Sequence, residues 1–554
     1  MRFSSREALR EYVEELKQRP RPAHSVWVCG GPGCAARGSL ELAAFFEKRA
    51  RELFGGEVGV QVETGVSGCM GPCGRGPVVH LEPEGRYYER VTQADAEGIL
   101  AALKAGGVYE QKDITNEPLL AKQHRIVLAG ADSSRPLDLD AWLLSGGFEA
   151  LAKAFFEMTP EQINEEVAAS GLRGRSGGGF PAGRKWEACR KAKGGRKYAL
   201  VNGDEGNPGA FVDQSVMEGR PYAVLEGLEI GAFCIGASEG VIYVRHEYPQ
   251  AIERLREAIA KLEEAGLLGA DILGSGFSFH AEICEGGGAF VCGESTALMT
   301  SIEGKAGVPR VKYVRSAEKG LWESPTILNN VETWANVPAI IRNGAAWFKQ
   351  LGTEKSSGTK LFSVVGDVRD PGLVEVPMGV TLRQIVCDLC GGMEEGRRFK
   401  AIQTGGPSGG CLPERLLDTP VDFDSLTSAG SMMGAGGMIV MDDSACMVDM
   451  ARHYIDFLVD ESCGKCIPCR EGLKKMQTIL HDLTEGRGRA GDTRLLAELA
   501  ASVSEIALCG LGQSAQNPVL STITHFPEEY EEHEKEHFCR AGVCAGMKGG
   551  ARRG

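Results

Sequence analysis

The sequence predicts a multidomain α/β protein that ends in a helical bundle. At 554 residues the chain is too long for one compact core, because domains usually hold about 100–200 residues. Strand-like runs such as SVWVC and GVIYVRHEY alternate with helical runs such as YPQAIERLREAIAKLEEAG over much of the chain. The 75 glycines exceed the usual share of about 7%. We therefore expect several domains whose loops are rich in glycine.

Residues 1–107 are expected to form a small α/β domain with a metal cluster. Two cysteine pairs, Cys29 with Cys34 and Cys69 with Cys73, stand in glycine-rich loops after strand-like runs. Four thiolates suit an iron–sulfur cluster or zinc, and the glycines let backbone amides approach the sulfurs. The gaps of four and three residues differ from the two-residue gaps common in structural zinc sites. The spacing therefore favours [2Fe-2S] over zinc or two disulfides.

Residues 124–345 follow a polar connector and are expected to form the largest α/β domain. The stretch SGLRGRSGGGFPAGRKWE, residues 170–187, combines glycines with Arg173, Arg175, Arg184 and Lys185 before a helix. Glycine amides beside positive side chains are typical of a phosphate site, and a plain glycine-rich turn is the alternative. The stretch lacks the GK[ST] ending of a P-loop and does not match the GxGxxG of a dinucleotide-binding fold.

Three further stretches of this domain place polar side chains in glycine-rich turns: VNGDEGNPGAFVDQS, GGGAFVCGESTALMTSIEG and PTILNNVETWANVP. Their carboxylates and amides are those of Asn202, Asp204, Glu205, Glu294, Asn329 and Asn330. Amides both donate and accept hydrogen bonds, as the edge of an isoalloxazine ring requires. We expect these stretches to form one ligand site.

Residues 357–440 are expected to form a small α+β domain, and residues 443–525 a helical bundle. In the bundle, Cys463, Cys466 and Cys469 follow one another at two-residue gaps and can hold three corners of a cubane. Cys509 is the candidate for the fourth ligand. REGL follows Cys469, whereas a bacterial ferredoxin run would continue to a fourth cysteine and a proline. The pattern therefore favours one [4Fe-4S] cluster in a helical domain over a ferredoxin fold.

The C-terminal tail, residues 526–554, contains a third group of metal-ligand residue types. His533, Cys539 and Cys544 are three candidate zinc ligands, and Cys446 is a candidate for the fourth. Free thiols on a tail that faces a partner are the alternative.

Charge and cysteine usage narrow the functional class. The formal charge of −14 argues against nucleic acid as a partner. The N-terminal stretch is charged throughout, and the sequence has no apolar run long enough for a membrane span. Eighteen cysteines without a secretory signal fit a reducing compartment, where thiols bind metals. We expect a cytoplasmic protein with no membrane span.

Taken together, the motifs of residues 124–525 resemble the NADH-oxidising 51 kDa flavoprotein subunit of complex I. Residues 1–107 resemble thioredoxin-like [2Fe-2S] ferredoxin domains. The β subunit of multimeric NAD-linked, electron-bifurcating [FeFe] hydrogenases is more similar still, because it also carries that N-terminal domain and a CGEST loop. The resemblance implies an FMN- and NADH-binding domain, a ubiquitin-like SLBB domain and a helical [4Fe-4S] domain.

The resemblance also implies roles for single residues. FMN would be bound by Gly174, Arg175, Gly177, Lys185, Asn202, Asp204, Glu205, Gly293, Glu294, Asn329 and Asn330. NAD(H) would be contacted by Phe180, Ser295 and Lys312. The flavin N5 accepts the hydride in that family, so no side chain is expected to act as catalytic acid or base.

Two departures concern the nicotinamide nucleotide. Asn207 and Ser295 stand where the respiratory subunits have glutamates, and the second of these contacts the ribose on the adenine side. Losing that carboxylate removes repulsion against a 2′-phosphate, yet NAD(H) remains the expected substrate.

The resemblance implies a diaphorase module that passes electrons between NADH, FMN and iron–sulfur clusters inside a hetero-oligomer. Expected partners are a small [2Fe-2S] subunit and a hydrogenase, formate dehydrogenase or other low-potential reductase. Bifurcation and the terminal acceptor stay open. The alternative is an electron-transfer scaffold that has lost its own nicotinamide activity through the changes at Asn207 and Ser295.

Overall fold

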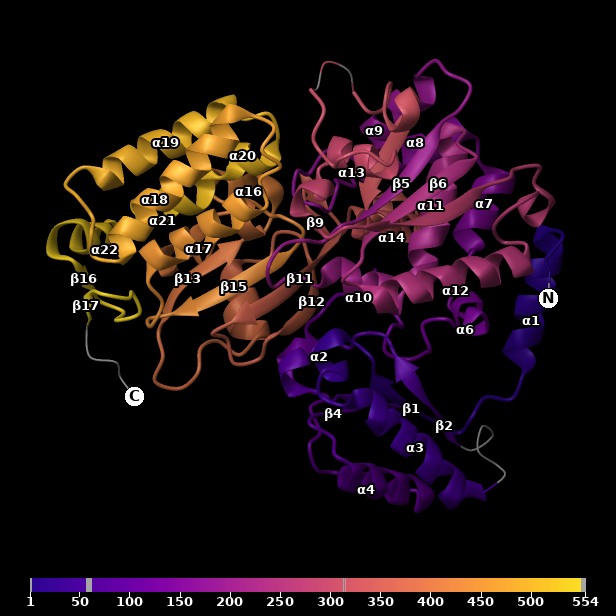
Figure 1. Cartoon of the computed structure of the whole chain (residues 1–554). Helices are drawn as coiled ribbons and strands as arrows, with labels where there is room; N and C mark the ends of the chain where they lie inside the picture. The colour runs from indigo at the N-terminus through magenta and orange to yellow at the C-terminus, as the bar shows by residue number, and fades with distance from the viewer. Residues whose placement is uncertain (1, 56–61, 312, 314, 550–554) are drawn as a thin grey trace.

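The computed structural model describes residues 2–55, 62–311, 313 and 315–549. Figure 1 shows the N-terminal unit below a large α/β unit, with a smaller sheet and a helical bundle beside them. The expected multidomain α/β architecture with a helical C-terminal region is confirmed. The domain boundaries given above stay predictions.

The N-terminal unit is built on a four-stranded sheet of order β2-β1-β3-β4, in which β1 is parallel to β2 and antiparallel to β3. Its elements are α1 (Arg6–Gln18), β1 (His24–Cys29), α2 (Pro32–Ala35), α3 (Ser39–Phe54), β2 (Val62–Ser67), β3 (Val79–Glu82), β4 (Arg86–Tyr88) and α4 (Gln93–Lys104). Phe46 of α3 and Ile99 of α4 are fully buried in its core. Helix α5 (Pro118–Ala121) lies in the connector that follows.

The large unit contains a parallel sheet of order β7-β6-β5-β8. Its elements are α6 (Leu139–Leu144), α7 (Glu149–Glu157), α8 (Pro160–Ala169), α9 (Ala182–Lys191), β5 (Tyr198–Gly203), α10 (Val212–Gly219), α11 (Pro221–Ile235), β6 (Glu239–Arg245), α12 (Pro249–Ala265), β7 (His280–Gly286), α13 (Ser295–Ile302), β8 (Thr326–Asn330), α14 (Val331–Asn343) and α15 (Ala345–Phe348). Strand β5 is buried along its length because helices cover both faces of a parallel sheet. Functional loops of such sheets gather at the carboxyl ends of the strands.

The third unit is a five-stranded sheet of order β12-β11-β15-β13-β14, so β12 lies at its edge. Its elements are β9 (Gly352–Thr353), β10 (Ser356–Ser357), β11 (Thr359–Gly366), β12 (Gly372–Pro377), β13 (Phe399–Thr404), β14 (Cys411–Pro413), α16 (Phe423–Ser428) and β15 (Gly437–Asp442). A buried ion pair joins this sheet to the large unit: Lys360 of β11 reaches Glu332 of α14 at 2.5 Å.

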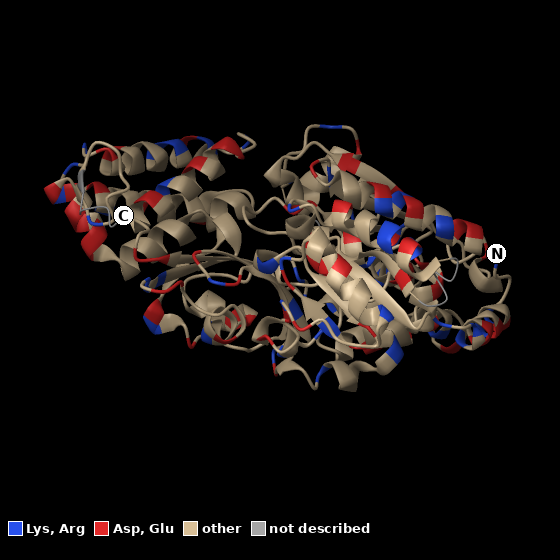
Figure 2. Cartoon of the chain, turned by 90° about the horizontal axis from the view of Figure 1, so that it is seen from below, with Lys and Arg blue, Asp and Glu red and all other residues tan. Residues whose placement is uncertain are grey.

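The C-terminal unit is a helical bundle. It comprises α17 (Met447–Asp460), α18 (Leu473–Thr484), α19 (Asp492–Ile506), α20 (Gly510–Ser514), α21 (Gln516–His525) and α22 (Pro527–Glu531), followed by the short strands β16 (Phe538–Cys539) and β17 (Lys548–Gly549). Apolar residues at helical spacing, such as Ile455, Leu480 and Leu496, form its core. Acidic and basic residues are both present on the helices near the C-terminus, and acidic ones gather at that end (Figure 2). Among the described residues, no helix is both long and apolar enough to cross a membrane.

Candidate functional site

A cavity of about 520 Å³ lies at the carboxyl ends of β5 and β8, between the large unit, the five-stranded sheet and the helical bundle. Seven of the residues expected to bind FMN line it: Gly177, Asn202, Asp204, Glu205, Gly293, Glu294 and Asn330. The parallel sheet therefore brings together polar residues that are far apart in the sequence, because its strands all end at this edge.

The carboxyl group of Asp204 is the clearest feature of the cavity wall. No described group donates a hydrogen bond to either carboxylate oxygen, although both are buried. Burial raises the pKa of Asp204 to about 7, while nearby Arg245 acts in the opposite direction. A buried acceptor without a partner is costly, so this carboxyl group fits a ligand that offers hydroxyl or N–H donors.

Local hydrogen bonds hold the surrounding residues in place. The Asn202 side chain donates to the Gly293 carbonyl at 2.9 Å and accepts from the Asp204 N–H at 3.0 Å. Glu294 caps the N-terminus of α13, since its Oε2 accepts from the Ala297 N–H at 3.0 Å. A Cβ on Gly293 would lie 3.3 Å from the Asp204 carbonyl oxygen, which leaves little room for a side chain there.

Four residues expected to bind FMN do not line the cavity: Gly174, Arg175, Lys185 and Asn329. The buried Arg175 guanidinium donates to the Ser357 carbonyl at 2.7 Å. Lys185 donates to the Leu328 carbonyl at 2.6 Å and to Asn329 Oδ1 at 3.2 Å, and burial lowers its pKa to about 8. The cationic groups of Arg175 and Lys185 thus donate to carbonyl and amide oxygens of the protein and do not line the cavity.

Phe180 and Ser295, two of the three residues expected to contact NAD(H), do not line the cavity. Phe180 is 48% exposed, and the Arg184 guanidinium stands 5.9 Å from its ring centroid. The Ser295 hydroxyl donates to Glu294 Oε1 at 3.2 Å. Lys312 lies outside the described residues.

Sequence reasoning missed the walls that the other two units contribute. They are Gly405, Ser408, Met432, Gly434, Ala435, Gly510, Leu511, Gln513, Ser514, Gln516 and Asn517. The glycine loops pack closely, since a Cβ on Gly177 would stand 2.7 Å from Gly434 Cα. The signals for this part of the wall in the sequence are two glycine-dense stretches, QTGGPSGG at residues 403–410 and SAGSMMGAGG at residues 428–437.

The four cysteines expected to bind [4Fe-4S] gather at the edge of the bundle. Burial raises the pKa of the Cys469 thiol to about 11, and the nearby thiols of Cys463, Cys466 and Cys509 act in the same direction. Gly512 packs beside Cys469, and a Cβ there would stand 2.6 Å from Ala507 Cβ, so the turn after Cys509 requires glycine. Four thiols at one place are the donor set of a [4Fe-4S] cluster.

The four cysteines expected to bind [2Fe-2S] also converge. Contacts with the Cys34 and Cys69 thiols lower the pKa of Cys29, and the Met70 N–H donates to Cys29 Sγ at 3.5 Å. Cys69 in turn contacts Cys73. A Cβ on Gly31 would stand 2.9 Å from Cys69 Sγ, so the loop has to be glycine where it passes the thiols. These residues fit a [2Fe-2S] cluster.

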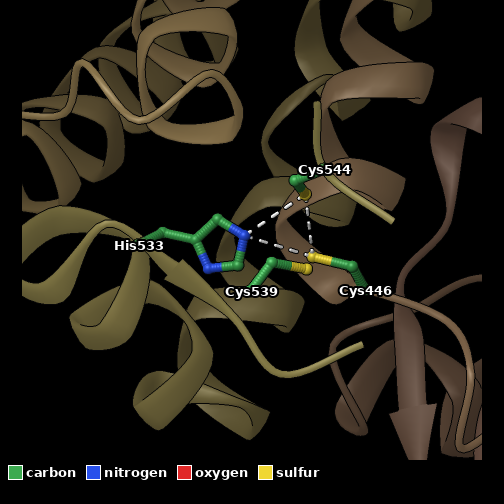
Figure 3. A group of neighbouring side chains, drawn as sticks. All are labelled: Cys446, His533, Cys539 and Cys544. Carbon is green, nitrogen blue, oxygen red and sulfur yellow. Dashed lines mark hydrogen bonds between the residues drawn. The ribbon is translucent and has the colours of Figure 1, made fainter. Parts of the chain in front are cut away.

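The tail group is the third convergence of ligands (Figure 3). Cys446, His533, Cys539 and Cys544 are buried, and their ligand atoms lie within 4.8 Å of one another. His533 Nε2 stands 3.4 Å from Cys446 Sγ and 3.3 Å from Cys544 Sγ. The other ring nitrogen, Nδ1, lies 2.6 Å from the Glu529 carbonyl oxygen, an arrangement that orients Nε2 toward the thiols. The last five residues of the expected tail, 550–554, lie outside the described residues.

Family models match four segments of the chain. They are a thioredoxin-like [2Fe-2S] ferredoxin (residues 7–104), the Nuo51 FMN-binding domain (167–339), an SLBB domain (361–412) and the NADH-ubiquinone oxidoreductase-F iron-sulfur binding region (449–533). The expected order of domain types is confirmed.

Similar proteins agree with these matches. The NADP-reducing hydrogenase subunit HndC of Solidesulfovibrio fructosivorans is 49% identical over 77% of this chain and 86% of its own length. The NADH-quinone oxidoreductase F subunit of Escherichia coli is 39% identical over 79% of this chain and 98% of its own length. A chain of an NAD⁺-reducing [NiFe]-hydrogenase superposes with a TM-score of 0.66 at 29% identity, covering 96% of this chain and 88% of that one. The chain therefore belongs to the family of NADH-binding flavoprotein subunits that includes HndC and its counterpart in NADH-quinone oxidoreductase.

Proposed function

We propose that the chain oxidises or forms NADH at an FMN held in the cavity and exchanges the electrons through the [4Fe-4S] site. The observation that carries this proposal is the shared wall between the two sites. Gly510 and Leu511 line the cavity and directly follow the candidate cluster ligand Cys509. Short separation favours transfer of single electrons between the two groups.

Bound FMN would supply hydride acceptance at N5 and release of electrons one at a time. The residues of the chain bind and orient it. Asp204 offers the ligand a carboxylate that no described group bonds, and Asn202 and Asn330, whose amides bond to the protein, line the cavity beside it. Gly177 and Gly434 let the two glycine loops pack against each other at the cavity wall, where each contributes lining. Residues of three units line the cavity, so the ring would contact all three of them.

NAD(H) is the proposed nucleotide. The exposed ring of Phe180 is available to stack on an adenine. Ser295 places a neutral hydroxyl at the start of α13, which would tolerate a 2′-phosphate better than a carboxylate. Discrimination against NADP(H) is therefore proposed to be incomplete.

The test is reduction of a viologen dye by NADH with the isolated chain after FMN and cluster reconstitution. Rapid, FMN-dependent dye reduction is expected. Bound FMN without dye reduction would refute the proposal and favour the alternative, an electron-transfer scaffold without nicotinamide activity.

We also propose that Cys446, His533, Cys539 and Cys544 bind one structural zinc ion. Three thiols and one imidazole are a common donor set for tetrahedral zinc. The ion would tie the tail to the start of α17, where Cys446 stands as the N-terminal cap. Metal analysis should find roughly one zinc per chain, reduced in Cys544→Ser and unchanged in Cys387→Ser, whose thiol is exposed and outside the group. Equal zinc contents in the two variants would contradict the assignment.

The relatives are subunits of larger assemblies, and we propose the same for this chain. Partners would be other redox subunits, such as a small [2Fe-2S] subunit and a hydrogenase, formate dehydrogenase or other low-potential reductase. Because all 18 cysteines are free thiols, many of them in metal-binding groups, a reducing compartment such as the cytoplasm is proposed. Co-purification of the native protein identifies the partners.

A further inference from the structure

The loop that carries Cys69 and Cys73 is joined to the edge strand of the five-stranded sheet. The Leu373 N–H of β12 donates to the Gly71 carbonyl at 2.9 Å, and the Gly74 N–H donates to the Pro371 carbonyl at 2.8 Å. Strand β12 has its sheet partner β11 on one side only. The cluster-binding loop thus pairs with backbone groups that a sheet edge otherwise leaves open.

Glycines permit this close approach from both sides. A Cβ on Gly372 would lie 2.3 Å from the Gly71 carbonyl oxygen, and one on Gly74 would lie 2.7 Å from Pro371 Cδ. Gly71 itself has a φ of 113°, which side chains rarely permit. The two segments therefore fit each other in shape as well as in hydrogen bonding.

An ion pair closes the contact beside Cys73. Arg75 Nε donates to Asp370 Oδ1 at 2.7 Å, and its second nitrogen donates to Oδ2 at 3.0 Å. The two side chains are only 16% and 13% exposed, so this bidentate pair is partly shielded from water. Glu117 of the connector approaches the same guanidinium at 3.2 Å.

The connector is fixed to the same strand. The buried Glu375 carboxylate accepts from three consecutive N–H groups, those of residues 126–128, at 2.8–3.0 Å. The His124 N–H donates to the Glu375 carbonyl at 3.0 Å. Arg125 then reaches back to the cluster-binding loop and donates to the Met70 carbonyl at 2.6 Å. Hydrogen bonds therefore hold strand β12, the connector and the cluster-binding loop together.

The other end of the N-terminal unit is anchored as well. The Tyr12 hydroxyl of α1 donates to Asp140 of α6 at 2.8 Å, and the Phe3 N–H donates to the Ala265 carbonyl at the end of α12 at 2.8 Å. Figure 1 shows α1 beside the large unit, away from the sheet of its own unit. Both chain ends of the cluster-bearing unit are therefore held.

We propose that the edge of β12 binds the cluster-binding loop permanently and that the ion pair between Arg75 and Asp370 holds this contact. The [2Fe-2S] domain then passes electrons from one fixed position. A domain that swings between partners would need to break these contacts in each cycle. In the docked arrangement the cluster keeps a fixed distance from the flavin cavity, and electrons reach or leave it without domain motion. Asp370 acts here as a positioning residue, since its carboxylate holds the arginine two residues after Cys73.

The test measures the distance between a gadolinium label on Cys387, an exposed cysteine of the five-stranded unit, and the reduced [2Fe-2S] cluster of the whole chain. Pulsed EPR is recorded at a temperature at which the faster-relaxing [4Fe-4S] signal is broadened. We expect one narrow distance distribution, which broadens in Asp370→Asn and stays narrow in Asp370→Glu. A broad distribution in the native sequence, or a narrow one in Asp370→Asn, overturns the proposal.

Amide exchange of the cluster-loaded chain gives a second readout that does not depend on the EPR signal. Losing the bidentate pair should speed exchange of residues 68–75 and 123–128 roughly tenfold or more in Asp370→Asn. Asp418→Asn is the matched control, because Arg383 binds Asp418 with the same distances, 2.7 and 3.0 Å, on the exposed surface of the same unit. Equal exchange rates of these residues in Asp370→Asn and Asp418→Asn would overturn the proposal that Asp370 holds the loop. The proposal rests on the [2Fe-2S] assignment, and absence of that EPR signal from the native sequence would refute the assignment separately.

Discussion

Replacing Lys360 with methionine perturbs the joint between the five-stranded sheet and the large unit beneath the cavity. The Lys360 ammonium donates to Glu332 at 2.5 Å, to the Leu361 carbonyl at 2.7 Å and to the Ala435 carbonyl at 2.9 Å. All three of its protons are thus used, and Ala435 lines the cavity. Methionine keeps most of the length of the side chain and removes the charge.

The size of the effect follows from burial. The side chains of Lys360 and Glu332 are 0% and 1% exposed, so removing the lysine leaves a buried carboxylate. Breaking such a pair costs about 3–5 kcal/mol of the free energy of unfolding. Burial raises the pKa of Glu332, and Lys360 opposes that rise, so the variant raises the pKa further. A carboxyl group with a raised folded pKa favours the fold below its unfolded pKa, and this contribution is lost as pH rises through the folded pKa. The free energy of unfolding that Lys360→Met loses should therefore grow with pH.

The assay is urea unfolding followed by tryptophan fluorescence. Five of the six tryptophans lie between residues 142 and 347, so the signal reports mainly on the large unit. Lys360→Met should lose about 3–5 kcal/mol, and Glu332→Gln combined with Lys360→Met should recover much of it because the carboxylate that the single variant leaves without its lysine is removed as well. A loss below about 1 kcal/mol, or a double variant as unstable as the single one, would contradict a costly unpaired carboxylate at Glu332.

Three further predictions concern the cofactor sites. Cys509→Ala should remove the [4Fe-4S] EPR signal and leave the [2Fe-2S] signal; persistence of both would contradict the ligand assignment. Burial raises the pKa of Asp204 to about 7, so FMN affinity of the flavin-free chain, measured by flavin fluorescence quenching, should rise as the carboxylate forms between about pH 6 and 8. Asp204→Asn should abolish that rise, and an unaltered pH profile would count against the contact. Ser295→Glu should lower kcat/KM for NADPH relative to NADH by roughly tenfold through repulsion of the 2′-phosphate, and an unchanged ratio would exclude this role.

Cysteine groups could be predicted from the sequence because ligand chemistry demands several thiols within reach of one metal centre. Cys463, Cys466 and Cys469 are close together in the chain. Cys509 reaches them only because the chain returns through α18 and α19, and that return depends on the fold. The tail group is a stronger case, since Cys446 lies far from His533 in sequence and 3.4 Å from it in space.

The cavity walls could not be predicted in the same way. Ser408, Met432 and Gln513 belong to units that carry no flavin motif, and their position depends on how three units pack. The direction of Arg175 was also beyond the sequence: its charge suggested a phosphate contact, yet its guanidinium points to the Ser357 carbonyl. Residue type indicates which chemistry is available, whereas the direction of a side chain depends on the backbone around it.

Electron transfer from NADH through FMN to the [4Fe-4S] site is tested most directly by mixing NADH anaerobically with the FMN- and cluster-reconstituted chain. Flavin absorbance and rapid-freeze EPR then follow the two groups. NADH should bleach the flavin band within a turnover, and the [4Fe-4S] signal should then appear without any partner protein. Bound FMN whose absorbance NADH leaves unchanged would contradict this electron transfer.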